Sequence, residues 1–207
     1  MDYKDLFTRI LISVFFLFIY FLLVVYSFKY VLLLVLIIYI IISFEVLFNF
    51  KNYRITIIIY LLLSFSSIYF HKFDPSLYLI FNLMVTIIIT FDIFSYLVGK
   101  FYGRRKISHK ISPNKTLEGL IGGICFSVSA SIFFCYLFNL LLTPQIIIFT
   151  LAIIVSAFFG DMIESIFKRL NNIKNSSNIL PGHGGFFDRF DSFILSLITF
   201  SFIIKFI

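Results

Sequence analysis

The sequence predicts an all-α integral membrane protein, a polytopic bundle of about seven transmembrane helices. Three observations favour this fold class. Of the 207 residues, 61% are hydrophobic. Only 13% are charged, whereas soluble domains carry roughly 25% charged residues. Long apolar runs also alternate with short polar breaks, and a bilayer-spanning helix needs roughly 20 mostly apolar residues.

The predicted spans are separated by breaks that hold polar or proline residues, which suit a membrane interface. No small-residue cleavage site follows the first apolar run, so we expect a retained helix rather than a signal peptide. In chain order the predicted spans are residues 10–26, 31–48, 55–70, 77–98, 117–142, 146–167 and 193–207.

The distribution of basic residues predicts the orientation of these spans. With the N-terminus in the cytoplasm, 14 of the 17 Lys and Arg residues fall on the inner side, as the positive-inside rule requires. The C-terminus is then outside, and we expect a multi-pass protein of the cell (inner) membrane. We interpret residues 1–207 as one domain, with a scaffold and dimer region in 1–90 and a catalytic region in 91–207.

Two long polar segments, residues 99–116 and 168–191, both fall on the predicted cytoplasmic side. We therefore expect an active site in a polar cavity that opens to the cytoplasm. No internal repeat is evident, which weakens an inverted-repeat transporter interpretation.

Ionisable residues inside apolar spans cost about 2.5–3.5 kcal/mol each on insertion scales, so each needs a reason. Asp92 lies in the fourth span, and Asp161 and Glu164 lie in the sixth. Asp161 and Lys168 share one helix face, with Glu164 or Ser165 between them. An internal salt bridge is the structural alternative for this face. Glu45 we interpret as an interfacial charge at the end of the second span.

The stretch "LPGHGGFFDRFD" at residues 180–191 places glycines and a histidine before an acidic pair. Glycines let backbone amides approach a phosphate closely. Asp188 and Asp191 flank Arg189, and Asp161 with Asp188 could supply carboxylate oxygens to a hard divalent cation. By itself the glycine turn is a weak signal, since such turns are common.

The first polar segment adds six Lys or Arg residues together with Ser112, Asn114 and Thr116. These groups predict a phosphate-rich ligand or a lipid headgroup, although positive-inside topology alone explains much of the charge. Acids within the bundle and cationic loops at its mouth suit metal-assisted phosphoryl or nucleotidyl transfer, with a lipid as one substrate. We expect no nucleic-acid partner and no zinc site.

These residues fall into two segments that resemble the phosphatidate cytidylyltransferase, or CDP-diacylglycerol synthase, family. The resemblance covers residues 91–192, in the family's order. The matching positions are Asp92, Tyr96, Gly99, Gly103, Ser112-Pro113, Lys115-Thr116, Glu118-Gly119, Gly122-Gly123, Ser165, Lys168-Arg169, Lys174, Pro181, His183-Gly184-Gly185, Asp188-Arg189 and Asp191.

The resemblance implies the reaction of CTP with phosphatidate to give CDP-diacylglycerol and pyrophosphate. It implies that Asp161 and Asp188 bind Mg²⁺, with a second cation left open, and that Asp92 and Asp191 support that site or add ligands. The phosphates would be bound by Lys168, Arg169, Lys174 and Arg189. The pocket for CTP or the lipid headgroup would include Ser112, Asn114, Lys115, Thr116, Glu118, Ser165, His183, Gly184 and Gly185.

Two departures from the family pattern are visible. Asn175 stands where members usually carry Asp, which removes a charge. The chain is also shorter than typical members, by one or two N-terminal spans, which bears on the homodimer that we expect. Two alternatives stay open: a related CTP-dependent transferase acting on another lipid phosphate or a polyprenol, and a non-catalytic membrane scaffold or transporter.

Overall fold

The computed structural model describes residues 15, 18–69, 75–108, 111–180 and 184–206. The chain divides into two compact units. Unit 1 comprises Met1–Phe65 and Phe167–Phe190, and unit 2 comprises Ser66–Ile166 and Asp191–Ile207. The boundaries of these units, after residues 65, 166 and 190, differ from the predicted boundary at residue 90. The assignment of a scaffold region and a catalytic region stays a prediction.

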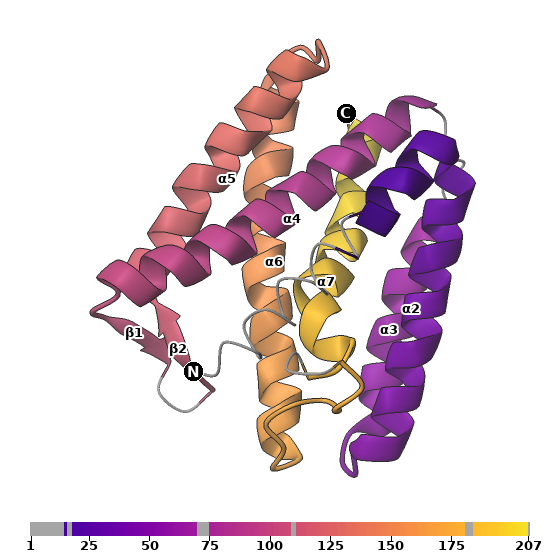
Figure 1. The fold of residues 1–207 in the computed structure, drawn as a ribbon, viewed down its shortest axis with the longest axis vertical. Coiled ribbons are helices and arrows are strands. Elements are labelled where there is room, and N and C mark those ends of the chain that lie inside the picture. The colour runs from indigo at the N-terminus through magenta and orange to yellow at the C-terminus, as the bar shows by residue number, and fades with distance from the viewer. Residues whose placement is uncertain (1–14, 16–17, 70–74, 109–110, 181–183, 207) are drawn as a thin grey trace. The chain divides into compact units, whose positions relative to one another are not determined.

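Unit 1 contains helices α2 (Phe28–Asn49) and α3 (Arg54–Tyr69, of which the residues up to 65 belong here). The two helices lie side by side (Figure 1). The turn between them is held by Asn171, whose side-chain oxygen accepts the backbone N–H groups of Lys51 at 2.8 Å and Asn52 at 2.7 Å. This contact attaches the segment that follows residue 170 to the α2–α3 turn.

Unit 2 is a helical bundle with one small hairpin. Strands β1 (Lys106–Ser108) and β2 (Ser112–Thr116) pair antiparallel, with Lys106 opposite Thr116 and Ser108 opposite Ser112. Thr116 also begins the next helix, because its hydroxyl accepts the N–H of Gly119 at 3.1 Å and so caps the helix start. The elements are α4 (Pro75–Tyr102), β1 (Lys106–Ser108), β2 (Ser112–Thr116), α5 (Leu117–Leu137), α6 (Pro144–Leu170, as far as residue 166), α7 (Phe187–Ile203, from residue 191) and a final 3₁₀ turn, Ile204–Phe206.

Helices α4 and α5 pack closely because glycines line their contact. Gly119 and Gly123 are four residues apart on α5, the spacing at which small residues let membrane helices approach. A Cβ at Gly119 would lie 2.5 Å from the backbone oxygen of Ser95, and one at Gly123 would lie 2.8 Å from the Phe91 ring. Any larger residue would push the helices apart.

The interior of unit 2 contains paired hydroxyl groups. Ser131 on α5 and Thr150 on α6 are 2.8 Å apart, and Ser156 on α6 and Thr199 on α7 are 2.6 Å apart. Thr150 and Ser156 also bond to the carbonyl four residues earlier in α6. These polar groups therefore have partners both within their own helix and across to a neighbour.

Four of the described helices are long and apolar enough to cross a membrane: Phe28–Asn49, Leu77–Tyr102, Leu117–Leu137 and Pro144–Leu170. This supports a multi-pass, mostly helical membrane protein. Helices α3 and α7 have 16 and 17 residues and are shorter. The first predicted span, 10–26, lies partly outside the described residues. Its residues 18–26 are described and are helical. The count of seven spans stays a prediction.

Both predicted polar segments contain more regular structure than expected. In 99–116, α4 continues to Tyr102 and the β-hairpin follows, so the fold is not purely α-helical. In the described part of 168–191, irregular backbone is confined to 171–180 and 184–186, because α6 runs to Leu170 and α7 begins at Phe187. Charge explains the second difference: Lys168 and Arg169 lie in the last turn of α6, and Asp188 lies in the first turn of α7, where each sign is favourable.

Candidate functional site

Unit 2 gathers three acids, Asp161 and Glu164 on α6 and Asp191 on α7, which we call the carboxylate cluster. Each offers one carboxylate oxygen, and these oxygens lie within 4.8 Å of one another. The side chains converge because Asp161 and Glu164 are one helical turn apart on the same face. Gly160 brings α7 close, since a Cβ there would lie 2.6 Å from the backbone oxygen of Asp191.

A lysine from the hairpin neutralises part of this charge. Lys115 Nζ lies 2.7 Å from Asp161 Oδ2 and 4.9 Å from the centre of the Phe158 ring. Ser165, one turn along α6, donates a long hydrogen bond of 3.4 Å to the other oxygen of Asp161. Two predicted substrate-binding residues, Lys115 and Ser165, are therefore in contact with a predicted metal ligand.

Asp92 adds a fourth acid near the cluster. Its Oδ1 accepts the hydroxyl of Ser192 at 3.2 Å. Burial of the Asp191 carboxyl raises the pKa of Asp191 well above its usual range, and the charges of Asp161, Glu164 and Asp92 raise it further. The cluster therefore concentrates negative charge where carboxylates repel one another. Carboxylate oxygens are also the ligands that hard divalent cations prefer, so the donor set fits such an ion.

Unit 1 holds the second group of predicted residues, around Asp188. Asp188 Oδ1 accepts Lys168 Nζ at 2.7 Å. Its Oδ2 accepts the backbone N–H groups of Ser176 and Gly185, both at 2.8 Å, and shares with Glu45 the one proton of the Ser176 hydroxyl, which lies 3.0 Å away. Gly184 has φ +85°, a conformation that favours glycine. Asp188 thus joins Ser176 to Gly185, and we call the described residues 176–180 and 184–185 the glycine loop.

A residue from α2 contacts the glycine loop as well. Glu45 is only 2% exposed, and its carboxylate accepts four hydrogen bonds from the loop and from the start of α7. Solvent therefore does not satisfy this carboxylate, while its place at the membrane interface stays a prediction. The charge is buried and is satisfied by the chain itself.

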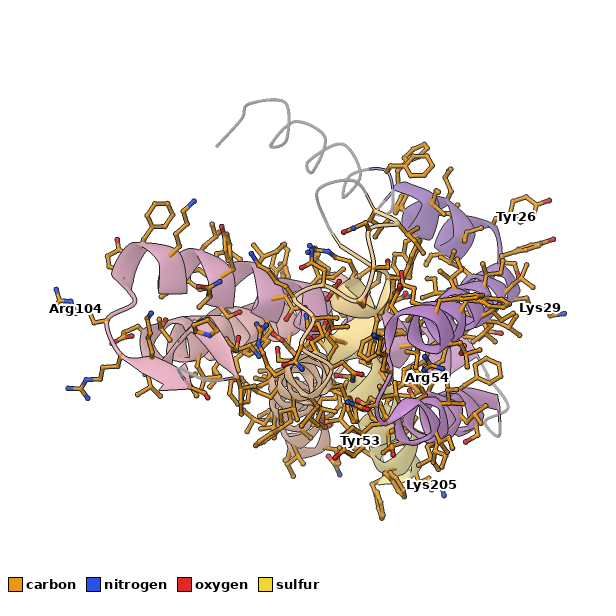
Figure 2. The ribbon with its side chains drawn as sticks, turned by 90° about the horizontal axis from the view of Figure 1, so that it is seen from below. Tyr26, Lys29, Tyr53, Arg54, Arg104 and Lys205 are labelled. Atoms are coloured by element: carbon orange, nitrogen blue, oxygen red, sulfur yellow. The ribbon has the colours of Figure 1, made fainter. Side chains whose placement is uncertain are left out.

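The hairpin of unit 2 carries the remaining residues predicted to bind substrate. Ser112 is half-buried, Asn114 is exposed and Thr116 is buried. Glu118 accepts the backbone N–H groups of Arg104 at 3.0 Å and Arg105 at 3.1 Å. Arg104 itself points away from the rest of unit 2 (Figure 2). Glu118 therefore shapes the turn that presents two arginines.

Three cationic residues of the prediction lie in unit 1 and are exposed: Arg169, Lys174 and Arg189. Arg169 donates to the backbone oxygen of Ile173 at 3.4 Å. His183 lies outside the described residues. Asp161 and Asp188 belong to different units, so their pairing as ligands of one cation stays a prediction.

Two residues with clear contacts were not assigned to the site from sequence. Glu164 joins the carboxylate cluster, and its spacing of three residues from Asp161 was the available signal. Ser176 bonds to both Glu45 and Asp188, but a serine in a polar loop carries no signal of its own.

Comparison with known proteins places these residues in a family context. A model of the cytidylyltransferase family matches residues 50–207. Phosphatidate cytidylyltransferase of Bacillus subtilis (strain 168) is 48% identical over 103 residues, which is 48% of this chain and 38% of that protein. The protein of the same name in Staphylococcus aureus (strain COL) is 44% identical over 108 residues, 51% of this chain and 41% of that protein.

A further relative is the uncharacterized protein YnbB of Escherichia coli (strain K12), which is 44% identical over 115 residues, 56% of this chain and 39% of that protein. The alignments thus span about two fifths of the length of these relatives. The family match covers both the carboxylate cluster and the glycine loop, and it confirms the resemblance read from the motifs. The chain belongs to the cytidylyltransferase family.

Proposed function

We propose that this protein is a phosphatidate cytidylyltransferase, which converts CTP and phosphatidate into CDP-diacylglycerol and pyrophosphate. Family membership and the names of two relatives support the proposal. The observation that carries it is the carboxylate cluster with Lys115 bound to Asp161. Acids on the helices α6 and α7, with a lysine from the hairpin, suit the transfer of a nucleotide to a lipid phosphate.

The chemistry requires one bond to form and one to break. A phosphate oxygen of phosphatidate attacks the α-phosphorus of CTP, and the bond from that phosphorus to the oxygen bridging to the β-phosphate breaks. Pyrophosphate leaves with the electron pair. Most of the catalytic effect in such transfers comes from positioning and charge neutralisation, so cationic side chains and bound cations matter more than a general base.

We propose that Asp161, Glu164 and Asp191 hold Mg²⁺, since their oxygens converge and fit a hard cation. Such an ion would offset charge on the phosphates during transfer. The sequence-based pairing of Asp161 with Asp188, and a second cation, belong to the same proposal. Lys115 forms an ion pair with Asp161. If Asp161 bound a cation instead, the ammonium group of Lys115 would be available to a phosphate.

The cations of unit 1 are proposed to bind phosphates. Lys168 is held by Asp188 at 2.7 Å, so its ammonium group is oriented before a substrate arrives. Arg169, Lys174 and Arg189 are exposed and are available to the leaving pyrophosphate. Gly184 and Gly185 leave room for close backbone approach, and His183 belongs to the same predicted pocket.

The finer topology is part of this proposal. Seven spans with the N-terminus in the cytoplasm would place both polar segments on the side where CTP is found. A cavity open to that side, in the cell (inner) membrane, would meet the lipid substrate from the bilayer. A homodimer is proposed as well.

The test is turnover of radiolabelled CTP with phosphatidate by the purified protein in detergent, with and without Mg²⁺. We expect product only with Mg²⁺. We expect Asp161→Asn and Asp188→Asn to reduce turnover by about a hundredfold or more, as losing a charge-stabilising group at a reaction centre does. Asp74→Asn, in the predicted outer turn between the third and fourth spans, is the matched control and should keep wild-type turnover.

Other outcomes would redirect the proposal. Wild-type turnover by Asp161→Asn would refute the cation site. Equal or faster turnover with another lipid phosphate or a polyprenyl phosphate would replace phosphatidate as the substrate. Lipid binding without pyrophosphate release would favour a non-catalytic scaffold.

A further inference from the structure

Glu45 lies in α2, ahead of the region that the cytidylyltransferase family model matches, which begins at residue 50. Its neighbours along α2 are Phe44 and Val46, and the helix is apolar for most of its length. Burying an ionised carboxylate is costly unless hydrogen bonds compensate it. A carboxylate that is 2% exposed in such a helix therefore needs a specific set of donors.

The donors all come from the glycine loop and the start of α7. Oε1 of Glu45 accepts the Ser177 hydroxyl at 2.8 Å and the Phe186 N–H at 2.8 Å. Oε2 accepts the Ser176 hydroxyl at 3.1 Å and the Phe187 N–H at 3.0 Å. The first N–H groups of a helix have no partner within the helix, so Glu45 supplies one from another segment.

Ser176 connects Glu45 to Asp188. Its hydroxyl lies 3.1 Å from Glu45 Oε2 and 3.0 Å from Asp188 Oδ2, while its backbone N–H donates to Asp188 at 2.8 Å. Gly185 fits between the two carboxylates, since its N–H bonds to Asp188 and a Cβ there would lie 2.6 Å from Glu45 Oε2. A displacement of Glu45 would therefore shift Ser176 and Gly185, and with them the hydrogen bonds of Asp188.

We infer that Glu45 is a positioning residue for the transfer reaction. It holds the glycine loop and the first turn of α7 in place and, through Ser176, fixes the carboxylate of Asp188 that orients Lys168. Glu45 does not touch the reacting atoms. The inference rests on the proposed cytidylyltransferase function, and it assigns α2 a part in catalysis that the family match does not cover.

The variant Glu45→Gln tests this inference because it keeps the size of the side chain. In either orientation its amide nitrogen faces a backbone N–H, which cannot accept a hydrogen bond, so at least one of the four hydrogen bonds is lost. We expect kcat to fall by about ten- to a hundredfold, the loss that corresponds to one or two hydrogen bonds to a charged group. KM for CTP should change by less than about threefold, because the interaction lost is not a contact with substrate.

Two serines provide a matched pair. Ser176→Ala removes a hydroxyl that contacts both carboxylates, whereas Ser177→Ala removes one that contacts Glu45 and the N–H of Ile179 but for which no contact with Asp188 is seen. We expect Ser176→Ala to lower kcat more than Ser177→Ala does. The double variant Glu45→Gln/Ser176→Ala should be little worse than Glu45→Gln, since residues acting through one network are not additive. Additive losses would mean that Glu45 acts independently of Ser176.

Backbone hydrogen exchange separates this inference from the proposed function. In wild-type protein the amides of Phe186 and Phe187 should be protected, and Glu45→Gln should raise exchange in the peptide covering 176–190 while α4 and α5 stay protected. If the wild-type protein makes no product, the proposed function fails and the exchange result alone decides whether Glu45 holds the loop. Unchanged exchange, or kcat within twofold of wild type in an active enzyme, would overturn the inference.

Discussion

At the scale of single residues, several acids accept hydrogen bonds from the backbone. Glu118 accepts the N–H groups of Arg104 and Arg105, and Asp188 accepts that of Gly185. A carboxylate whose oxygens already accept backbone N–H groups has less capacity to bind a substrate directly. Glu118 therefore contributes to phosphate binding mainly by fixing the turn that carries the two arginines.

The variant Glu118→Gln distinguishes this indirect role from direct binding. It weakens the bonds to Arg104 and Arg105, so we expect KM for CTP to rise by about three- to tenfold with kcat nearly unchanged, as loss of a charged hydrogen-bond acceptor predicts. Steady-state kinetics of the purified enzyme provide the measurement. Tyr102→Phe, at an exposed position just before this turn, is the control and should leave both constants unchanged.

A fall in kcat at constant KM would contradict this reading. It would indicate that Glu118 acts directly at the reaction centre, and not by holding the turn that carries Arg104 and Arg105.

Residue types and spacing revealed some of these roles and not others. Asp161, Asp188 and Lys168 stood out because charged groups beside apolar spans are costly and need a reason. Glu45 did not, because its four donors are 131 to 142 residues away in the sequence. Only the folded chain brings them together, and the sequence alone suggested a solvated charge at the membrane surface.

At the scale of elements, the α4–α5 contact depends on the absence of side chains. Gly119 faces the backbone of Ser95, which cannot move aside as a flexible side chain would. The same helix start contains the Thr116 cap and Glu118. The hairpin with its predicted substrate residues is therefore positioned by a glycine contact.

Replacing Gly119 with Ala should destabilise the protein, because the added Cβ would lie 2.5 Å from the Ser95 oxygen. Overpacking of this kind typically costs about 1–3 kcal/mol, so we expect a lower thermal unfolding midpoint in detergent. Ser129→Val also adds volume to α5, but at an exposed position, and should leave the midpoint near that of wild type. An unchanged midpoint for Gly119→Ala would show that α4 and α5 can separate without cost.

Hydropathy predicted the elements better than their ends. The predicted span 77–98 corresponds to α4, which continues to Tyr102, and the span 117–142 corresponds to α5, which ends at Leu137. Helices continue past the apolar region because polar residues such as Lys100 are still good helix formers. The hairpin was missed because "SPNKT" is short and polar, and its pairing partner is only three residues long.

At the scale of the whole molecule, the strongest regularity is the asymmetry of charge. Many of the basic residues lie in the two polar segments that also carry the predicted site. The positive-inside rule and phosphate binding both require positive charge in these segments. The proposed orientation places the α5–α6 turn, near Leu141, outside the cell and the glycine loop inside.

Cysteine labelling checks this orientation. The two native cysteines, Cys125 and Cys135, would first be replaced by Ala, since both are free thiols. In this background we expect Leu141→Cys to react with a membrane-impermeant maleimide in intact cells, and Asn178→Cys to react only after the membrane is opened. The reverse pattern would invert the topology, and labelling of both positions in intact cells would rule out their lying on opposite sides.

The paired hydroxyl groups of unit 2 bear on how the protein is made. Thr150 and Ser156 each bond to a carbonyl of their own helix as well as to a hydroxyl of a neighbouring helix. Within α6, neither hydroxyl group depends on another helix for a hydrogen bond as it enters the lipid. The contacts of these two hydroxyl groups to α5 and α7 can therefore form after α6 has entered the bilayer.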